Sequence, residues 1–307
     1  MIKMSAIATL VALVLGAILV QAQEGQDINK LYADMNTAYS AKQYDQAVSL
    51  AEQILALPEL EKVDKKNQLQ IRFILANSLF SVKKDLDKAI AAADALVGQV
   101  EEMKGNGGGN QFDRTFLVPG MQIRFYSLVE RFKASKNAGD LVQAADTLWT
   151  IYEQYDQKPA NVRLLVNIAQ MLSSADQRDK AIELLEKLST RDLGGQGSTC
   201  FHLLATNYSK KGDKARSITY LQKAYDARRI AKYALDLGQM LFASKDVDGA
   251  IRYLAEAYVL DQENANSKAY KTLRHLIYNV KGKDKGEDEL DSMLKDAVAQ
   301  ARTRVKG

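Results

Sequence analysis

The side chains that could perform catalysis are few, and their spacing keeps them apart. The chain has 307 residues with one Cys and two His. Cys200 and His202 stand two positions apart in a segment of helical periodicity, so they point to different faces. A thiolate nucleophile needs a base within reach, and a zinc site needs three or four N, S or O ligands. We expect Cys200 to be a buried apolar residue and His202 a polar contact residue.

A glycine-rich segment, Gly194-Gly195-Gln196-Gly197-Ser198-Thr199, resembles loops that hold phosphate. It lacks the Gly-Lys-Ser/Thr that completes a P-loop, and no strand is predicted before it. We expect a flexible loop whose Ser198 or Thr199 caps the next helix. The sequence thus predicts no catalytic, cofactor-binding or metal-binding residue, and a protein that is not an enzyme.

Composition narrows the class of protein. Forty-two basic residues face 38 acidic ones, 47% of the chain is hydrophobic, and there are three Pro. A single Cys excludes a disulfide framework, and the apolar content with low net charge argues against disorder. The charge is too small and too mixed to indicate a nucleic-acid partner. Abundant Ala, Leu, Lys, Glu and Gln favour helix.

The first 22 residues have the pattern of a secretory signal peptide. Lys3 precedes a run of apolar and small residues from Ala6 to Val20, interrupted by Thr9, and Val20-Gln21-Ala22 forms a small-x-small cleavage pattern. The run is shorter than the roughly 20 residues of a membrane span. We predict cleavage after residue 22 and a periplasmic or secreted protein; an uncleaved anchor formed by residues 5–20 is the alternative.

A phrase recurs along the rest of the chain: a turn, a hydrophobic residue, two polar residues, then a small residue and an aliphatic one. The small residues, here called anchors, are spaced by 42, 55, 37, 36 and 33 positions, and they are Ala47, Ala89, Ala144, Ala181, Ser217 and Ala250. Apolar residues at steps of three and four flank each anchor, which predicts a helix on either side. Two helices approach closely where the side chains between them are small.

Two of these units are the most regular. The first has Phe201, Leu204, Ala205, Tyr208, Gly212, Asp213 and Ala224, and the second has Leu237, Gly238, Leu241, Val247, Ala250, Leu254 and Ala257. These residues resemble the tetratricopeptide repeat (TPR) family, although the bulky Trp of the family pattern is absent. The resemblance implies an all-α, right-handed superhelical solenoid of antiparallel helix pairs, with about six units over residues 23–265.

Two segments depart from the repeat. The long spacing between Ala89 and Ala144 predicts an insertion near 103–121, with a flexible loop at 105–109 and its far end at Pro119-Gly120. Residues 266–307 read as a degenerate unit, in which the charged helix 287–304 caps the array, because a solenoid needs a polar end.

The TPR resemblance also implies that the first helix of each unit lines a concave groove that binds polypeptides. Its expected contact residues are Tyr32, Asn36, Lys133, Arg163, Asn167, Gln170, His202, Thr206, Lys232 and Gln239, with Lys210 beside them. The second unit would contribute Ile74, Ser78 and Val82. This polar, mildly basic groove favours an acidic segment or a C-terminal carboxylate. The family's carboxylate clamp is not matched, because Leu75 stands where an Asn is expected.

We therefore predict an exported scaffold that binds a protein or peptide through its groove and helps to assemble an envelope complex, without cofactor or nucleic acid. One alternative is an accessory subunit of a separately encoded periplasmic enzyme, docking through residues 266–307. Another is a small-ligand binder with residues 105–120 as a lid.

Overall fold

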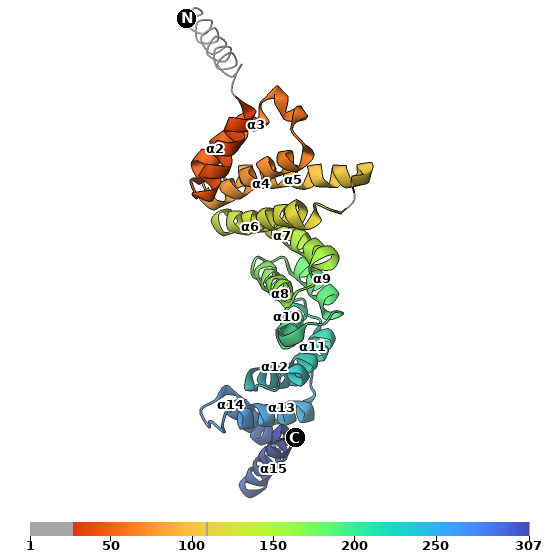
Figure 1. The fold of residues 1–307 in the computed structure, drawn as a ribbon. Coiled ribbons are helices and arrows are strands. Elements are labelled where there is room, and N and C mark those ends of the chain that lie inside the picture. The colour runs from red at the N-terminus through yellow and green to blue at the C-terminus, as the bar shows by residue number, and fades with distance from the viewer. Residues whose placement is uncertain (1–26, 109, 307) are drawn as a thin grey trace, which may run out of the picture. The chain divides into compact units, whose positions relative to one another are not determined.

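Helices are the only regular elements in the described part of the chain, residues 27–108 and 110–306 of a computed structural model (Figure 1). The predicted signal segment, residues 1–22, lies outside these residues. No helix among those described combines the length and the apolar character needed to span a membrane. The predicted all-α fold of consecutive helix pairs is confirmed.

The chain divides into two compact units, at residue 135. The helices of unit 1 are α2 (Ile28–Ser40), α3 (Tyr44–Leu55), α4 (Lys65–Val82), α5 (Leu86–Met103) and α6 (Val118–Ser135). The longer helices of unit 2 are α7 (Ala138–Thr150), α8 (Pro159–Ser174), α9 (Arg178–Ser189), α10 (Gly197–Lys210), α11 (Lys214–Ala227), α12 (Ala231–Ala243), α13 (Val247–Leu260), α14 (Lys268–His275) and α15 (Glu287–Lys306). The two helices assigned to the third repeat, α6 and α7, therefore belong to different units.

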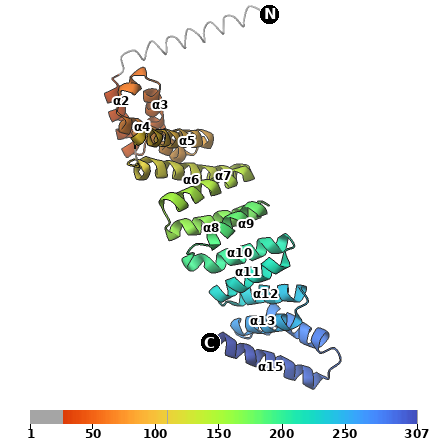
Figure 2. The same ribbon diagram turned by 90° about the vertical axis from the view of Figure 1, so that its right-hand side faces the viewer.

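Each complete pair consists of a first helix and a second helix that pack against each other, as Figure 2 shows for α10 with α11 and for α12 with α13. The anchor positions explain this packing, because all six anchors are fully buried. At Gly238 the approach is so close that an added Cβ would lie 2.8 Å from Leu254 Cγ. Ser217 fits the same position because its hydroxyl donates to the carbonyl oxygen of Ala205 at 2.9 Å.

The turn between the two helices of a pair needs a residue with positive φ. Gly212 takes this place in one unit, with φ of 82°. Elsewhere the position holds Lys42, Lys83 or Lys245, with φ between 55° and 67°. A side chain in this region costs free energy that glycine avoids. The turn is therefore harder to recognise in this sequence than it would be if every repeat had a Gly at this position.

A recurring ion pair links consecutive repeats within each unit. An Asp two positions before the anchor pairs with a Lys or Arg of the following repeat. The pairs are Asp45–Lys84 and Asp87–Arg131 in unit 1, and Asp179–Lys211 and Asp248–Lys281 in unit 2. Because the acids are exposed, each pair contributes little stability by itself. This set is called the ion-pair ladder below.

The predicted loop after α5 is helical only in part. A π-helical turn, Lys104–Gly108, continues α5, but Asn106 and Gly107 inside it have non-helical dihedral angles, with φ of 85° at Gly107. A second π-helical turn, Asp113–Leu117, leads directly into α6. Pro119 and Gly120 lie inside the first turn of α6 rather than at the end of a loop. Phe116 and Leu117 are 1% and 0% exposed. Burial of these apolar side chains against α5 and α6 orders the segment, which does not favour a lid.

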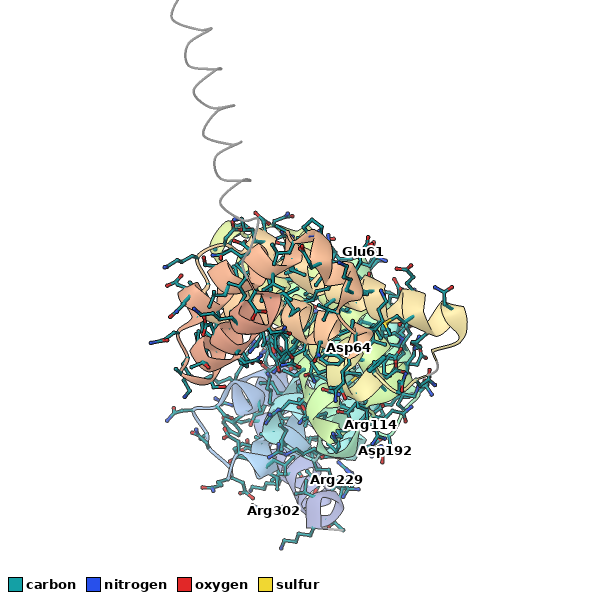
Figure 3. The ribbon with its side chains drawn as sticks, turned by 45° about the horizontal axis from the view of Figure 1, so that its top comes forward. Glu61, Asp64, Arg114, Asp192, Arg229 and Arg302 are labelled. Atoms are coloured by element: carbon teal, nitrogen blue, oxygen red, sulfur yellow. The ribbon has the colours of Figure 1, made fainter. Side chains whose placement is uncertain are left out.

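The C-terminal end of unit 2 folds back on the last regular pair. α14 runs into a π-helical segment, Leu276–Lys281, and α15 then packs along α13 (Figure 2). Arg302 forms two hydrogen bonds of 2.6 Å with Glu263, and Arg304 Nε lies 2.6 Å from Glu256 Oε1. Arg229, which Figure 3 labels together with Arg302, donates to the carbonyl oxygen of Arg304 at 3.1 Å.

Candidate functional site

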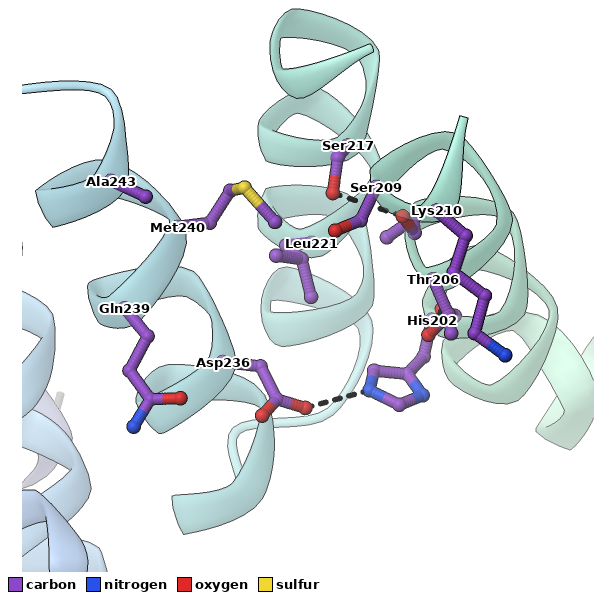
Figure 4. A pocket seen from close by; sticks show the side chains of 11 residues that line it. His202, Thr206, Ser209, Lys210, Ser217, Leu221, Asp236, Gln239, Met240 and Ala243 are labelled. Carbon is purple, nitrogen blue, oxygen red and sulfur yellow. Dashed lines mark hydrogen bonds and ion pairs between the residues drawn. The ribbon is translucent and has the colours of Figure 1, made fainter. Parts of the chain in front are cut away.

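A groove in unit 2 contains several of the predicted contact residues. It has a volume of about 410 Å³ and lies between α10, α11 and α12 (Figure 4). We call it the α10–α12 groove. Its lining consists of His202, Ala205, Thr206, Ser209, Lys210, Ser217, Leu221, Asp236, Gln239, Met240 and Ala243. Predicted residues His202, Thr206 and Gln239 thus lie in one site.

The periodicity of α10 places its side chains on two different faces. Cys200, Leu204 and Tyr208, at steps of four, are buried. His202 and Thr206 follow the same step along the groove. The prediction for Cys200 is confirmed: burial raises the pKa of its thiol to about 12, and Sγ lies 3.7 Å from the carbonyl oxygen of Leu185. This thiol stays protonated and is not a nucleophile at neutral pH.

One wall of the groove carries a hydrogen-bonded pair. His202 Nε2 lies 2.8 Å from Asp236 Oδ2, which connects the first helices of two consecutive repeats. The imidazole ring also lies against Tyr233, with centroids 4.9 Å apart. Asp236 is absent from the predicted contact set, although it stands four residues after Lys232 and three before Gln239, on the same side of α12. The helical spacing of Asp236 from Lys232 and Gln239 was the sequence signal that could have identified it as a contact residue.

The hydroxyl groups near this pair are engaged elsewhere. Thr206 Oγ1 donates to the carbonyl oxygen of His202 at 2.8 Å, and Ser217 donates to Ala205. A hydrolytic triad would need a hydroxyl that donates to the imidazole. The arrangement instead offers fixed polar groups that can accept hydrogen bonds from, or donate them to, a ligand lying in the groove.

The floor of the groove is apolar. Leu221 of α11 is buried, and Ala205 leaves space above it because its side chain is a single methyl group. Met240 closes the side formed by α12. Met is flexible and fills irregular space, so such a floor can receive aliphatic side chains of different shapes. The groove therefore combines an apolar base with polar walls.

The remaining predicted residues of unit 2 lie on the neighbouring first helices. Arg163, Asn167 and Gln170 are exposed at steps of four and three, in one row along α8. Lys232 is exposed near the start of α12. Neither the α8 row nor Lys232 lines the α10–α12 groove, but both belong to the same series of first helices (Figure 1).

The predicted residues of unit 1 have local partners. Tyr32 donates its hydroxyl to Asn67 Oδ1 at 3.1 Å, and Asn36 donates to the carbonyl oxygen of Tyr32 at 2.8 Å. Lys133 pairs with Glu130 at 2.7 Å. The expectation that Ile74 and Ser78 line a groove is wrong, since both are 0% exposed. α4 packs against α3, α5 and α6, which cover these positions.

The glycine-rich segment before α10 also differs from expectation. Gly194–Gln196 is a short 3-10 helix that continues into α10, which begins at Gly197. The N-cap is Gln196, and its side chain makes no capping bond. Ser198 lies inside the helix and is buried, so neither it nor Thr199 is the cap. The 3-10 turn satisfies the role that a polar cap would otherwise have.

Comparisons with known proteins agree with this description. Residues 202–266, which include most of α10 and all of α11 to α13, match the tetratricopeptide repeat family. This match supports the TPR resemblance where the motif is most regular. No curated protein matches the chain.

Several solved structures are similar at low identity. MamA has 20% identity over 57% of this chain and 96% of its own, with a TM-score of 0.40. The C-terminal part of a TPR repeat-containing protein from Cytophaga hutchinsonii has 12% identity, 89% and 93% coverage and a TM-score of 0.44. A thermophilic TPR protein in Thermus thermophilus has 11% identity, 82% and 99% coverage and a TM-score of 0.28.

Proposed function

We propose that this chain is an exported, non-catalytic scaffold whose unit 2 binds an extended polypeptide along its first helices. The observation that carries the proposal is the α10–α12 groove. Polar groups of two consecutive first helices face each other there across an apolar floor. An extended segment presents alternating side chains and free backbone groups, which match such a surface.

The geometry supports binding rather than catalysis. The groove has an imidazole and a carboxylate already hydrogen-bonded to each other, and the hydroxyls of Thr206 and Ser217 donate to backbone carbonyls. Fixed polar groups of this kind give orientation and specificity to a ligand. The tail alternative is less favoured, because the ion pairs of Arg302 and Arg304 engage α15 with unit 2. We propose that α15 caps the array and that the scaffold helps to assemble an envelope complex.

The test of polypeptide binding is to fill the groove without disturbing the fold. Ala243, the last residue of α12, is exposed and lines the groove, so Ala243→Trp places a bulky ring in it. Ala227, the last residue of α11, is equally exposed but lies outside the groove, so Ala227→Trp is the matched control. Peptides selected from a random display library on the unmodified chain should lose binding to Ala243→Trp and retain it with Ala227→Trp. Retained binding by both variants, or no selected peptide, would reject the proposal.

A second candidate function is binding of a small ligand in the same groove. A volume of about 410 Å³ lies within the roughly 300–1,000 Å³ range of small-molecule sites. A metabolite panel screened by thermal shift separates the two functions, since Ala243→Trp should abolish the shift caused by any small ligand. Export is tested by N-terminal sequencing of the cell-envelope fraction, where we expect a mature chain that begins at Gln23.

A further inference from the structure

The first helices of unit 2 have a strongly one-sided charge. α8, α10, α12 and α14 contain a single carboxylate, that of Asp236. Their six cationic residues are Arg163, Lys210, Lys232, Lys268, Lys271 and Arg274. The second helices are balanced when taken together: three cations face three acids in α9, three face one in α11, and one faces two in α13.

The cations of the first helices also differ from those of the second helices in their ion pairs. On the second helices, Lys180 and Lys187 both pair with Glu183, and Arg252 pairs with Glu256. Among the described residues, none of the six first-helix cations forms an ion pair, and all six are exposed. Only Arg274 has a close ring partner, Tyr278, at 4.9 Å. Unpaired cations of one sign create a positive potential that attracts an acidic partner.

The α10–α12 groove adds an apolar position to this positive surface. Lys210 forms part of the groove lining, and Leu221 and Met240 form its floor. We propose that the first-helix surface of unit 2 binds an acidic polypeptide segment. Its carboxylates face Arg163, Lys210 and Lys232, and one of its aliphatic side chains lies on Leu221 and Met240. This inference rests on the proposed polypeptide binding and names the chemistry of the partner.

A nucleic acid fits this surface less well. Single-stranded nucleic acids need exposed aromatic rings on which the bases stack. Of the aromatic residues of α12, Tyr233 is only 7% exposed and lies against His202, and Phe242, at 37%, exposes one ring rather than a series of stacking rings. An apolar floor likewise offers nothing to a sugar-phosphate chain, whereas it accepts an aliphatic side chain.

The test measures binding of a fluorescent Ser/Gly peptide that carries several Glu and a central Leu, by fluorescence anisotropy with the full chain. Two further peptides share its length, one with Gln for each Glu and one with Ser for the Leu, and the fourth probe is an oligothymidylate with the same net charge as the acidic peptide. We expect the acidic peptide to bind about tenfold more tightly than its Gln twin, with an affinity that falls as salt is added. Loss of the Leu should weaken binding as well.

Two triple variants with the same change in net charge separate a specific surface from a general charge effect. The first-helix variant is Arg163→Gln with Lys210→Gln and Lys232→Gln. The second-helix variant is Lys180→Gln with Lys187→Gln and Lys223→Gln. We expect the first to lose about tenfold in affinity and the second to stay within about twofold. Thermal unfolding of both variants checks that the fold is intact.

Each other outcome overturns the inference in a distinguishable way. Equal binding of the acidic peptide and its Gln twin would contradict the charge preference and leave the proposed polypeptide binding in place. Equal weakening by both triple variants would indicate unspecific attraction to a basic protein. Tighter binding of the oligothymidylate would indicate a nucleic-acid surface. No binding of any peptide here, with peptides still selected by the display experiment, would reject only the acidic partner.

Discussion

The two units place their first helices in different roles. In unit 1, first-helix side chains bind neighbouring repeats: Tyr39 accepts a hydrogen bond from Asn77 at 2.6 Å, and Arg124 of α6 pairs with Asp94 at 2.7 Å. In unit 2, the cations of the corresponding helices have no ion pair within the described residues. The contrast concerns Lys and Arg alone, because the bond between His202 and Asp236 and the bond from Asn207 to Ser173 also link first helices in unit 2.

Further cross-links of unit 2 lie on its second helices. Tyr225 of α11 donates to Glu256 of α13 at 2.8 Å, and Tyr253 of α13 donates to Gln222 of α11 at 2.6 Å. The second helices thus also hold consecutive repeats together. We propose from this comparison that the exposed Lys and Arg side chains of the unit 2 first helices serve partner binding rather than stability, and each prediction below tests one part of that contrast.

The largest effect is expected at Glu256, which is 2% exposed. Its carboxylate accepts hydrogen bonds from Tyr225, Arg304 and Arg252. Glu256→Ala leaves these donors without their acceptor, so we expect a loss of about 3 kcal/mol in the free energy of unfolding, measured by urea titration. Glu183→Ala is the control, because Glu183 also pairs with two cations but is half exposed. Equal losses in both variants would contradict this expectation.

A smaller effect is expected at Tyr39 in unit 1. Tyr39→Phe removes the hydrogen bond with Asn77 but keeps the ring contacts with Tyr44 and Phe73. We expect a loss of about 1 kcal/mol in unfolding free energy. The matched change in unit 2 is Arg163→Gln, which removes an exposed side chain without an ion pair and should leave stability unchanged. If Arg163→Gln were the more damaging of the two, the contrast between the units would be wrong.

The smallest expected effect is on the pH dependence of stability. The hydrogen bonds from Arg302 lower the pKa of Glu263 below its ordinary value of 4.5. A carboxylate with a lowered pKa in the folded state stabilises the fold above that ordinary value, and the contribution disappears as the pH falls through the folded-state pKa. Arg302→Gln should therefore be less stable than the unmodified chain at pH 7, and the difference should shrink in acid. Lys295→Gln on the same helix should show no such pH dependence.

The helix pairs could be predicted from the sequence because their cause is local. Each crossing of two helices needs a small residue. The six buried anchors, with apolar periodicity on both sides, mark these crossings in the sequence. The buried state of Cys200 followed from the same periodicity. The position of α15, expected at 287–304 and found at Glu287–Lys306, followed from its own apolar stripe.

The errors arose where distant parts of the chain decide the outcome. The positive φ of 85° at Gly107 agrees with the glycine signal, but the predicted far end of the loop at Pro119-Gly120 is wrong, because Phe116 and Leu117 are buried and residues 113–117 form a helical turn. Asp236 belongs to the site because of a bond to His202 in the preceding repeat, whereas its helical spacing from Lys232 and Gln239 indicates only the side of α12 on which it lies. The cover over Ile74 and Ser78 depends on how many helices surround α4.

The ion-pair ladder has a consequence for how such a chain can change in length. Because the acid stands two positions before the anchor in each of these four repeats, a repeat inserted or removed as a whole presents the same acid to a base of the next repeat. Repeats whose anchor is preceded by Val142 or Ala215 lack the acid. Whole-repeat duplication and excision should be tolerated best at the four joints that carry the pair, which makes them the natural splice points for building longer or shorter versions of this protein.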